Sequence, residues 1–265
     1  MPLKSNANLN SELVLDLSGI PLAKTLFRMG LTMDLILLAL DLIFNYARVI
    51  DVLPLRRLFN IAREDGIGTY FASFQTLCVG AVLGLLWVQA RLQQCAAGQV
   101  RGWGFLSLFF FYMAFDDAAE LHERFGYILK AILKSLQSEP HPISKTLEQF
   151  PSYPWHLLLG PVLFVILIMM ILFIYRQVQT AQVRYILFGA LMLYVAAVGL
   201  DFLEGLDGFF NSIAEALSVR KYTVSHLFKA AEEFMELLGG TLFLTGFISV
   251  FISRGRSFKI VLREP

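Results

Sequence analysis

Five ionisable side chains stand together directly after an apolar run that covers residues 103–115. The four acids and one histidine are Asp116, Asp117, Glu120, His122 and Glu123. An ionisable group at the centre of a membrane helix costs about 2.5–3.5 kcal/mol on insertion scales, so such groups are rare there unless they serve a function. We therefore predict that the chemistry of this protein takes place where this apolar run ends.

Further acids lie near the ends of other apolar runs, far away in the sequence. Glu64 stands just before one run, Asp201 and Glu204 stand at the end of another, and Glu232 and Glu236 open the last. If six helices alternate across a bilayer, all of these helix ends fall on one side. At 1.5 Å per residue the acids then gather in one outer third of a hydrocarbon core about 30 Å thick.

Helical phase decides which of these side chains share a face. With 100° per residue, Asp116, Glu120 and Glu123 cover an arc of about 60° on one continuous helix. His122 lies about 120° from Asp116 on that helix. We therefore expect His122 to have a different neighbour or to reach the acids from the side.

Several carboxylates in a medium of low dielectric constant cannot all stay ionised. Either a cation neutralises them or some of them hold protons. Ligands that are rich in oxygen and include one imidazole suit Mg²⁺, Mn²⁺, Ca²⁺ or iron better than structural zinc, which prefers Cys and His. We predict a divalent metal ion as the cofactor, held by Asp116, Glu120, Glu123, Glu204 and Glu236.

The remaining polar residues receive supporting roles. His122 or Glu233 would act as a general acid or base beside the metal. In the alternative interpretation the acids have a structural role only, because they pair with one another and with nearby basic residues or lie among lipid headgroups. Those basic residues are Arg63, Arg124 and Lys229, and the further polar site candidates are Glu64, Asp117, Asp201 and Glu232.

Composition places the chain in a membrane. Of its 265 residues 57% are hydrophobic and only 16% are charged, with a mean hydropathy of +0.63. A soluble domain carries about 25% charged residues, so the deficit indicates a multi-pass membrane protein. A net charge of +1 gives no reason to expect nucleic acid as a partner. The partner that we expect is the lipid bilayer.

The apolar runs predict an all-α fold, a polytopic membrane bundle of about six transmembrane helices. We expect an N-terminal tail with an amphipathic segment (1–30), a transmembrane domain (31–253) and a basic C-terminal tail (254–265). Six spans put both termini on one side, and the basic residues after the last span favour the cytoplasm. The predicted spans cover residues 31–50, 69–90, 102–123, 155–175, 184–206 and 225–252, the third continuing as a helix toward residue 137.

The first predicted span has a polar face of its own. Asp41, Asn45 and Arg48 follow one another at i, i+4 and i+7 and therefore share one side of a helix. Two interpretations are open. Either Asp41 forms an ion pair with an arginine between helices, or it lines a polar cavity.

Four stretches of the chain resemble an uncharacterised family of bacterial multi-pass membrane proteins, some of which are labelled automatically as multidrug transporters. They are FNIAREDGIGTYFASFQ (59–75), FFYMAFDDAAELHE (110–123), DFLEGL (201–206) and HLFKAAEEFMELLGGTLF (226–243). The second contains the family's D-[DE]-x4-H-E motif. The family usually has Asp-Glu where this chain has Asp116-Asp117, and often Trp in place of Tyr70.

This resemblance implies a protein of the bacterial inner membrane, and it brings no established reaction. It also implies a set of recurrent polar positions, which correspond to Glu64, Ser73, Asp116, His122, Glu123, Glu204, Glu233 and Glu236. The resemblance narrows the site and leaves the function to the chemistry of these residues.

Three functions fit these observations. The first is a metal-dependent membrane enzyme that acts on a lipid-like substrate, since the acids lie at the depth of lipid headgroups. The second is a proton- or cation-coupled transporter or channel, for which a homo-oligomer would make up for the small size of the chain. The third is a non-catalytic component for membrane assembly or sensing.

Overall fold

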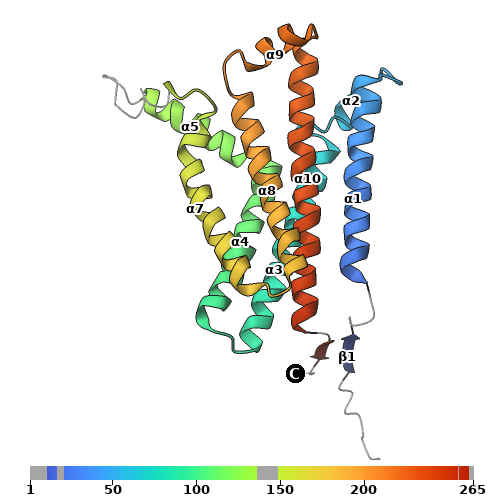
Figure 1. Cartoon of the computed structure of the whole chain (residues 1–265), viewed down its shortest axis with the longest axis vertical. Helices are drawn as coiled ribbons and strands as arrows, with labels where there is room; N and C mark the ends of the chain where they lie inside the picture. Colours follow the sequence, from blue (N-terminus) through green and yellow to red (C-terminus); the bar gives the residue numbers. More distant parts are fainter. Residues whose placement is uncertain (1–10, 17–20, 136–148, 256, 263–265) are drawn as a thin grey trace, which may run out of the picture.

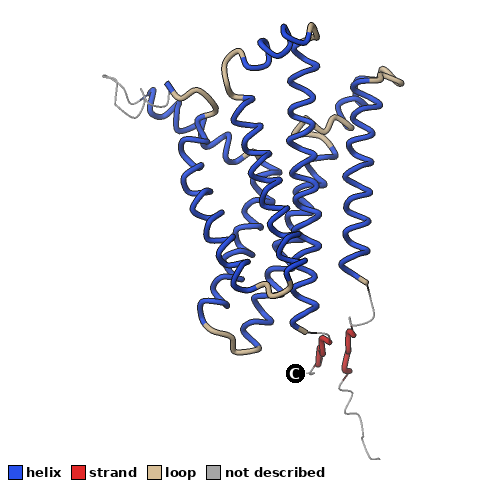
Figure 2. Tube along the Cα trace, viewed as in Figure 1, coloured by secondary structure: helices blue, strands red, loops and turns tan. Residues whose placement is uncertain are grey.

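The computed structural model describes residues 11–16, 21–135, 149–255 and 257–262, and it consists of long helices that run side by side (Figure 1). Shorter helices connect them near the ends of the bundle (Figure 2). They are a π-helical turn (Leu42–Tyr46), α2 (Leu53–Leu58), α5 (Leu121–Ser135) and α9 (Phe209–Leu217). The long helices are α1 (Leu22–Asp41), α3 (Ile67–Leu92), α4 (Ala97–Ala119), α7 (Pro154–Gln177), α8 (Ala181–Glu204) and α10 (Lys221–Arg254).

The prediction of an all-α membrane helix bundle is confirmed. Among the described helices, α3, α7, α8 and α10 are long and apolar enough to cross a membrane. The α7 helix has the highest mean hydropathy, 3.1, and only 11% of its apolar window is buried inside the protein. It therefore presents most of its surface outward, as a helix in contact with lipid does. That α1 and α4 also cross the membrane stays a prediction.

The first helix begins earlier than the sequence suggested. It starts at Leu22, directly after Pro21, and not at residue 31. Leu22, Ala23 and Leu26 pack against the main hydrophobic core, so these residues gain burial by becoming helical. The proline fits this start because a helix tolerates proline at its N-terminal end, where its missing N–H is not needed.

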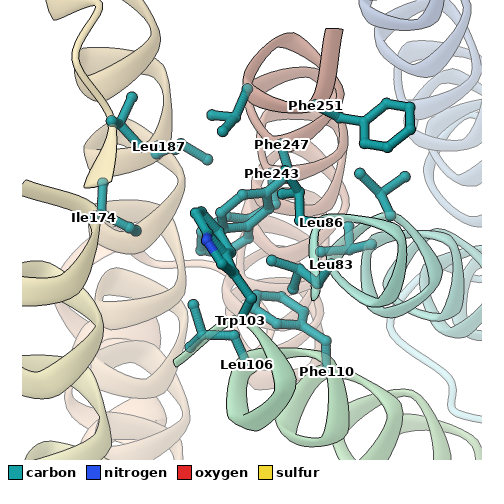
Figure 3. Packing of buried hydrophobic residues seen from close by; sticks show 14 of the residues in the cluster. Leu83, Leu86, Trp103, Leu106, Phe110, Ile174, Leu187, Phe243, Phe247 and Phe251 are labelled. Carbon is teal, nitrogen blue, oxygen red and sulfur yellow. The ribbon is translucent and has the colours of Figure 1, made fainter. Parts of the chain in front are cut away.

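The main hydrophobic core fills the half of the bundle where α3, α4, α7, α8 and α10 meet (Figure 3). Trp103 lies at its centre and is 0% exposed. Its ring meets the ring of Phe173 edge to face, with centroids 4.8 Å apart, and the guanidinium of Arg254 lies 5.0 Å from its centroid. Aromatic rings packed in this way supply much of the apolar burial that holds helices together.

Small residues on α10 let its neighbours approach closely. A Cβ atom on Gly239 would lie 2.7 Å from Cε2 of Tyr194, so only glycine leaves room for α8 at this point. The sequence had placed Gly239 on the same face as Glu232 and Glu236. This close approach brings the acids of α8 and α10 together.

A buried polar triad joins α1 to the bundle. Asp34 is 0% exposed, and its carboxylate accepts hydrogen bonds from Nε2 of Gln75 (3.2 Å) and from the hydroxyl of Thr241 (2.8 Å). These residues lie on α1, α3 and α10 respectively. Buried hydrogen bonds to a carboxylate are stronger than neutral ones, so the triad fixes where α1 sits.

We expect Asp34→Ala to lower the free energy of unfolding by about 1–3 kcal/mol, because Gln75 and Thr241 would each lose a buried acceptor. Thermal unfolding of the protein in detergent measures this change. Met33→Ala is the control, since Met33 is its exposed neighbour on the same helix, and such substitutions stay within about 0.5 kcal/mol. Equal stability of both variants would show that the triad contributes nothing net.

The segment predicted as the third span is broken. The α4 helix ends at Ala119, and Glu120 has the left-handed conformation (φ 51°, ψ 39°) before α5 starts at Leu121. For a residue with a Cβ atom this conformation costs about 1–2 kcal/mol. The prediction of one helix running through Glu123 and onward is therefore wrong, and the chain changes direction in the middle of the acidic motif.

The two terminal segments pair with each other. Strand β1 (Ser11–Asp16) and strand β2 (Ser257–Leu262) form a two-stranded antiparallel sheet in which Ser11 lies opposite Leu262. The sequence had treated both as tails, and it did not predict strands there. The pairing places both terminal segments at the same end of the bundle (Figure 1).

Candidate functional site

An acidic cavity of about 280 Å³ lies where α4, α5, α7, α8 and α10 meet. The basic side chains among its described lining residues are Lys229 and His122. The acids greatly outnumber them, so the cavity is suited to cations. Its eight carboxyl side chains are Glu64, Asp116, Asp117, Glu120, Asp201, Glu232, Glu233 and Glu236.

The structure thus brings together most of the residues that the sequence singled out. All four of the further polar candidates, Glu64, Asp117, Asp201 and Glu232, line the acidic cavity. So do both residues proposed for proton transfer. Of the five predicted metal ligands, Asp116, Glu120 and Glu236 line it, Glu204 lies beside it, and the side chain of Glu123 on α5 is outside the described part.

Three carboxylates lie close enough to share one metal ion. Asp201, Glu204 and Glu232 each offer a carboxylate oxygen, and these atoms lie within 4.8 Å of one another. Asp201 and Glu204 are three residues apart at the end of α8 and share a face, and Glu232 faces them from α10. Oxygen ligands of this kind suit Mg²⁺, Mn²⁺ or Ca²⁺.

Two of these carboxylates have oxygens that the protein itself does not use. Oε2 of Glu204 and Oε2 of Glu232 are buried and have no hydrogen-bond partner within the described residues. Glu232 is only 8% exposed. Because a buried, unpaired carboxylate oxygen is costly, this arrangement favours a cation as the missing partner. Only Glu204 of this group was among the predicted ligands.

His122 faces the acids, although helical phase had turned it away. Its Nδ1 lies 2.8 Å from Oδ2 of Asp116, and its backbone N–H donates to Oδ1 of the same carboxylate at 2.9 Å. The left-handed conformation of Glu120 makes this possible, because it folds the start of α5 back over the end of α4. A carboxylate on Nδ1 orients the ring and leaves Nε2 for proton transfer.

A second histidine contacts the same tryptophan as the first. The ring of His122 meets Trp155 edge to face (4.8 Å between centroids), and the ring of His156 stacks on Trp155 at 3.9 Å. Nε2 of His156 lies 3.3 Å from Oδ2 of Asp201. The histidines of two histidine–aspartate pairs therefore contact one indole ring. A Trp-His pair at the start of an apolar helix is typical of a membrane interface, so the sequence alone does not single out His156.

The predicted basic partners pair with only some of the acids that line the cavity. Nζ of Lys229 lies 3.7 Å from Oε1 of Glu64, and Arg124 lies 3.7 Å from the carboxylate of Glu120 on the outer surface of α5. Arg63 pairs at 2.7 Å with Asp65, an exposed acid outside the cavity, and it lowers the pKa of Asp65 through a hydrogen bond. The interpretation that salt bridges satisfy the acids thus accounts for only part of the cluster.

The polar face of the first span belongs to another cluster. Asp41 is 0% exposed, accepts a hydrogen bond from Asn45 at 2.9 Å, and lies 3.4 Å from Nε2 of His226. His226 Nδ1 in turn lies 2.8 Å from the hydroxyl of Tyr46. The π-helical turn places Tyr46 against α10, and the partner of Asp41 on α10 is a histidine and not an arginine.

Beside the acidic cavity is an apolar cavity, also of about 280 Å³, between α4, α7 and α8. Trp155, Tyr194 and Val198 line both cavities, as do Phe109 and Met113. The two spaces therefore adjoin, and together they form one hollow with a polar and an apolar end.

A family model described as a domain of unknown function (DUF8692) matches residues 30–251. No curated protein and no solved structure matches the chain. The matched region contains all the helices that line the two cavities.

Proposed function

We propose that this chain, which belongs to the family described as a domain of unknown function (DUF8692), is a membrane enzyme that uses a divalent cation to act on a lipid-like substrate. The observation that carries this proposal is the group of Asp201, Glu204 and Glu232, in which one oxygen of each glutamate is buried and has no hydrogen-bond partner among the described residues. A metal ion bound there would polarise a substrate oxygen or lower the pKa of a bound water.

The His122–Asp116 pair supplies the proton transfer. Asp116 is buried and holds Nδ1 of the imidazole, so Nε2 is the nitrogen that would take a proton from water or substrate and return it later. Glu233 lines the same cavity and is the second candidate for this role. Both groups line a cavity that Trp155 and apolar residues of α7 also line.

The place of the site in the membrane agrees with a lipid-like substrate. The acids lie toward one end of the apolar helices, where headgroups would be, and the apolar cavity extends from them into the bundle. We further propose six membrane crossings in a bacterial inner membrane, with both termini in the cytoplasm.

A proton- or cation-coupled transporter is the second candidate. It is favoured by Asp34, a fully buried carboxylate in the middle of α1 that extends the polar groups beyond the acidic cavity. The main hydrophobic core is evidence against a transporter. Its buried side chains, which include Leu83 and Leu86 on α3 and Phe247 on α10, are apolar and offer no ligand to a moving ion.

Metal analysis of purified protein tests the proposal. We expect about one divalent metal ion per chain by elemental analysis, removed by a chelator and restored by Mn²⁺. Because a ligand at 100 times its Kd stabilises the folded state by about 2.7 kcal/mol, Mn²⁺ should also raise the unfolding temperature of chelator-treated protein. Protein that contains no metal and shows no such rise would contradict the proposal.

A further inference from the structure

The apolar cavity is built to hold a hydrocarbon chain. Its walls are mainly Phe109, Met113, Leu163, Leu167, Met170 and Phe243. It lies behind α7, the helix that presents most of its surface outward. At about 280 Å³ the cavity is at the lower limit of ligand pockets, which gives it room for one chain rather than two.

The acidic cavity determines which charge the headgroup of such a hydrocarbon chain can carry. Eight carboxyl groups line it against Lys229 and His122, and its described lining contains no arginine. The carboxyl groups outnumber these two basic side chains eight to two, so the cavity presents mainly hydrogen-bond acceptors and negative charge even though some of the acids hold protons. An anionic headgroup would be repelled here, whereas an ammonium group would find several hydrogen-bond acceptors.

Two further features point to a bound cation. Glu232 is buried and directs an unpartnered oxygen into the site. Trp155 and Tyr194 stand where the cavities join, and aromatic faces attract ammonium groups.

We propose that the joined cavities bind a single-chain amphiphile with a protonated amine as its head. The hydrocarbon chain occupies the apolar cavity, and the ammonium group lies among the carboxylates of the acidic cavity. This inference rests on the proposed function in one respect, namely that the amphiphile would be the substrate of the cation-dependent enzyme.

Tryptophan quenching tests this binding in phosphatidylcholine nanodiscs. The probe is 6-bromododecylamine, whose bromine stands partway along the chain near the junction and quenches nearby indole rings. Trp155→Phe identifies the part of the signal that comes from the junction. We expect saturable quenching by this amine, and at least tenfold weaker quenching by 6-bromododecanoic acid, which has a carboxylate head, and by the short amine 6-bromohexylamine. Equal or tighter binding of the carboxylate would overturn the proposal.

Two glycine variants provide a matched pair. A Cβ atom added at Gly160 or at Gly199 would meet nothing within 4 Å, so both positions accept a side chain. Gly160 lines the apolar cavity, and Gly199 lines neither cavity. Gly160→Phe should weaken binding of the amine at least tenfold, and Gly199→Phe should leave it unchanged. Equal binding by both variants would contradict the assignment of the chain to this cavity.

Adding a chelator separates this inference from the proposed function. Saturable amine binding by a protein that contains no metal as purified and that Mn²⁺ does not stabilise would refute the metal enzyme and support the amine site. Metal binding together with equal quenching by the amine and carboxylate probes would support the metal enzyme and refute the amine site. If Gly160→Phe fails to fold, the amine and carboxylate probes can still be compared on the unaltered protein, and that comparison tests the amine site.

Discussion

The double variant Asp201→Asn/Glu232→Gln is expected to bind Mn²⁺ at least about 100-fold more weakly than the unaltered protein, since losing even an indirect metal contact costs 10–100-fold. Both substitutions keep the size of the side chain and remove its charge. Two of the three carboxylates that lie within 4.8 Å of one another would then be neutral. Titration of chelator-treated protein with Mn²⁺, followed by thermal unfolding, measures the affinity.

The same variant distinguishes a metal site from a structural cluster. Without metal, crowded carboxylates repel one another, so neutralising two of them should raise the unfolding temperature. If the acids instead formed stabilising salt bridges, the unfolding temperature of the double variant should fall. The control is Asp207→Asn/Glu215→Gln, which neutralises two exposed acids outside the acidic cavity. A Mn²⁺-dependent rise that survives in the double variant would exclude this group as the metal site.

Trp103→Ala should lower the free energy of unfolding by about 3–5 kcal/mol, the largest effect that we expect from any single change in the main core. Trp103 is completely buried and touches Phe173, Phe247 and the guanidinium of Arg254. Its Nε1 has no hydrogen-bond partner within the described residues, so the loss would come from packing. Chemical or thermal unfolding in detergent measures it.

Trp87→Ala is the matched control for that prediction. Trp87 lies on the neighbouring helix α3, is partly exposed, and carries Arg91 over its ring at 5.2 Å. Its removal leaves a smaller cavity, so we expect a clearly smaller loss of stability. Equal losses of stability in the two variants would mean that the central position of Trp103 in the core adds nothing to its contribution to stability.

The long helices could be predicted from the sequence because each is a long apolar run between polar connections. Their boundaries were less certain, and the break at Glu120 was not predicted at all. The stretch AELHER contains no glycine or proline, and its residues favour helix. The break forms because the carboxylate of Asp116 accepts two bonds from His122, which offset the cost of the left-handed residue.

The gathering of acids was predictable from the alternation of spans, whereas their exact partners were not. Asp201 and Glu204 share a face of α8, but nothing in the local sequence shows that Glu232 of α10 would approach them. The contact of His156 was not predicted for the same reason, because its aspartate lies 45 residues further along the chain. The paired strands at the termini each consist of six residues, too short a signal without knowledge of the partner.

The pairing of β1 with β2 has a consequence for the synthesis of the protein. The ribosome makes β1 before β2, and the 240 residues between Asp16 and Ser257 take about 12–48 s at 5–20 residues per second. Until then β1 has an open edge, to which other chains could add. Only a chain translated as far as Leu262 can close the sheet, so the exposed edge of β1 persists while all the long helices are being made.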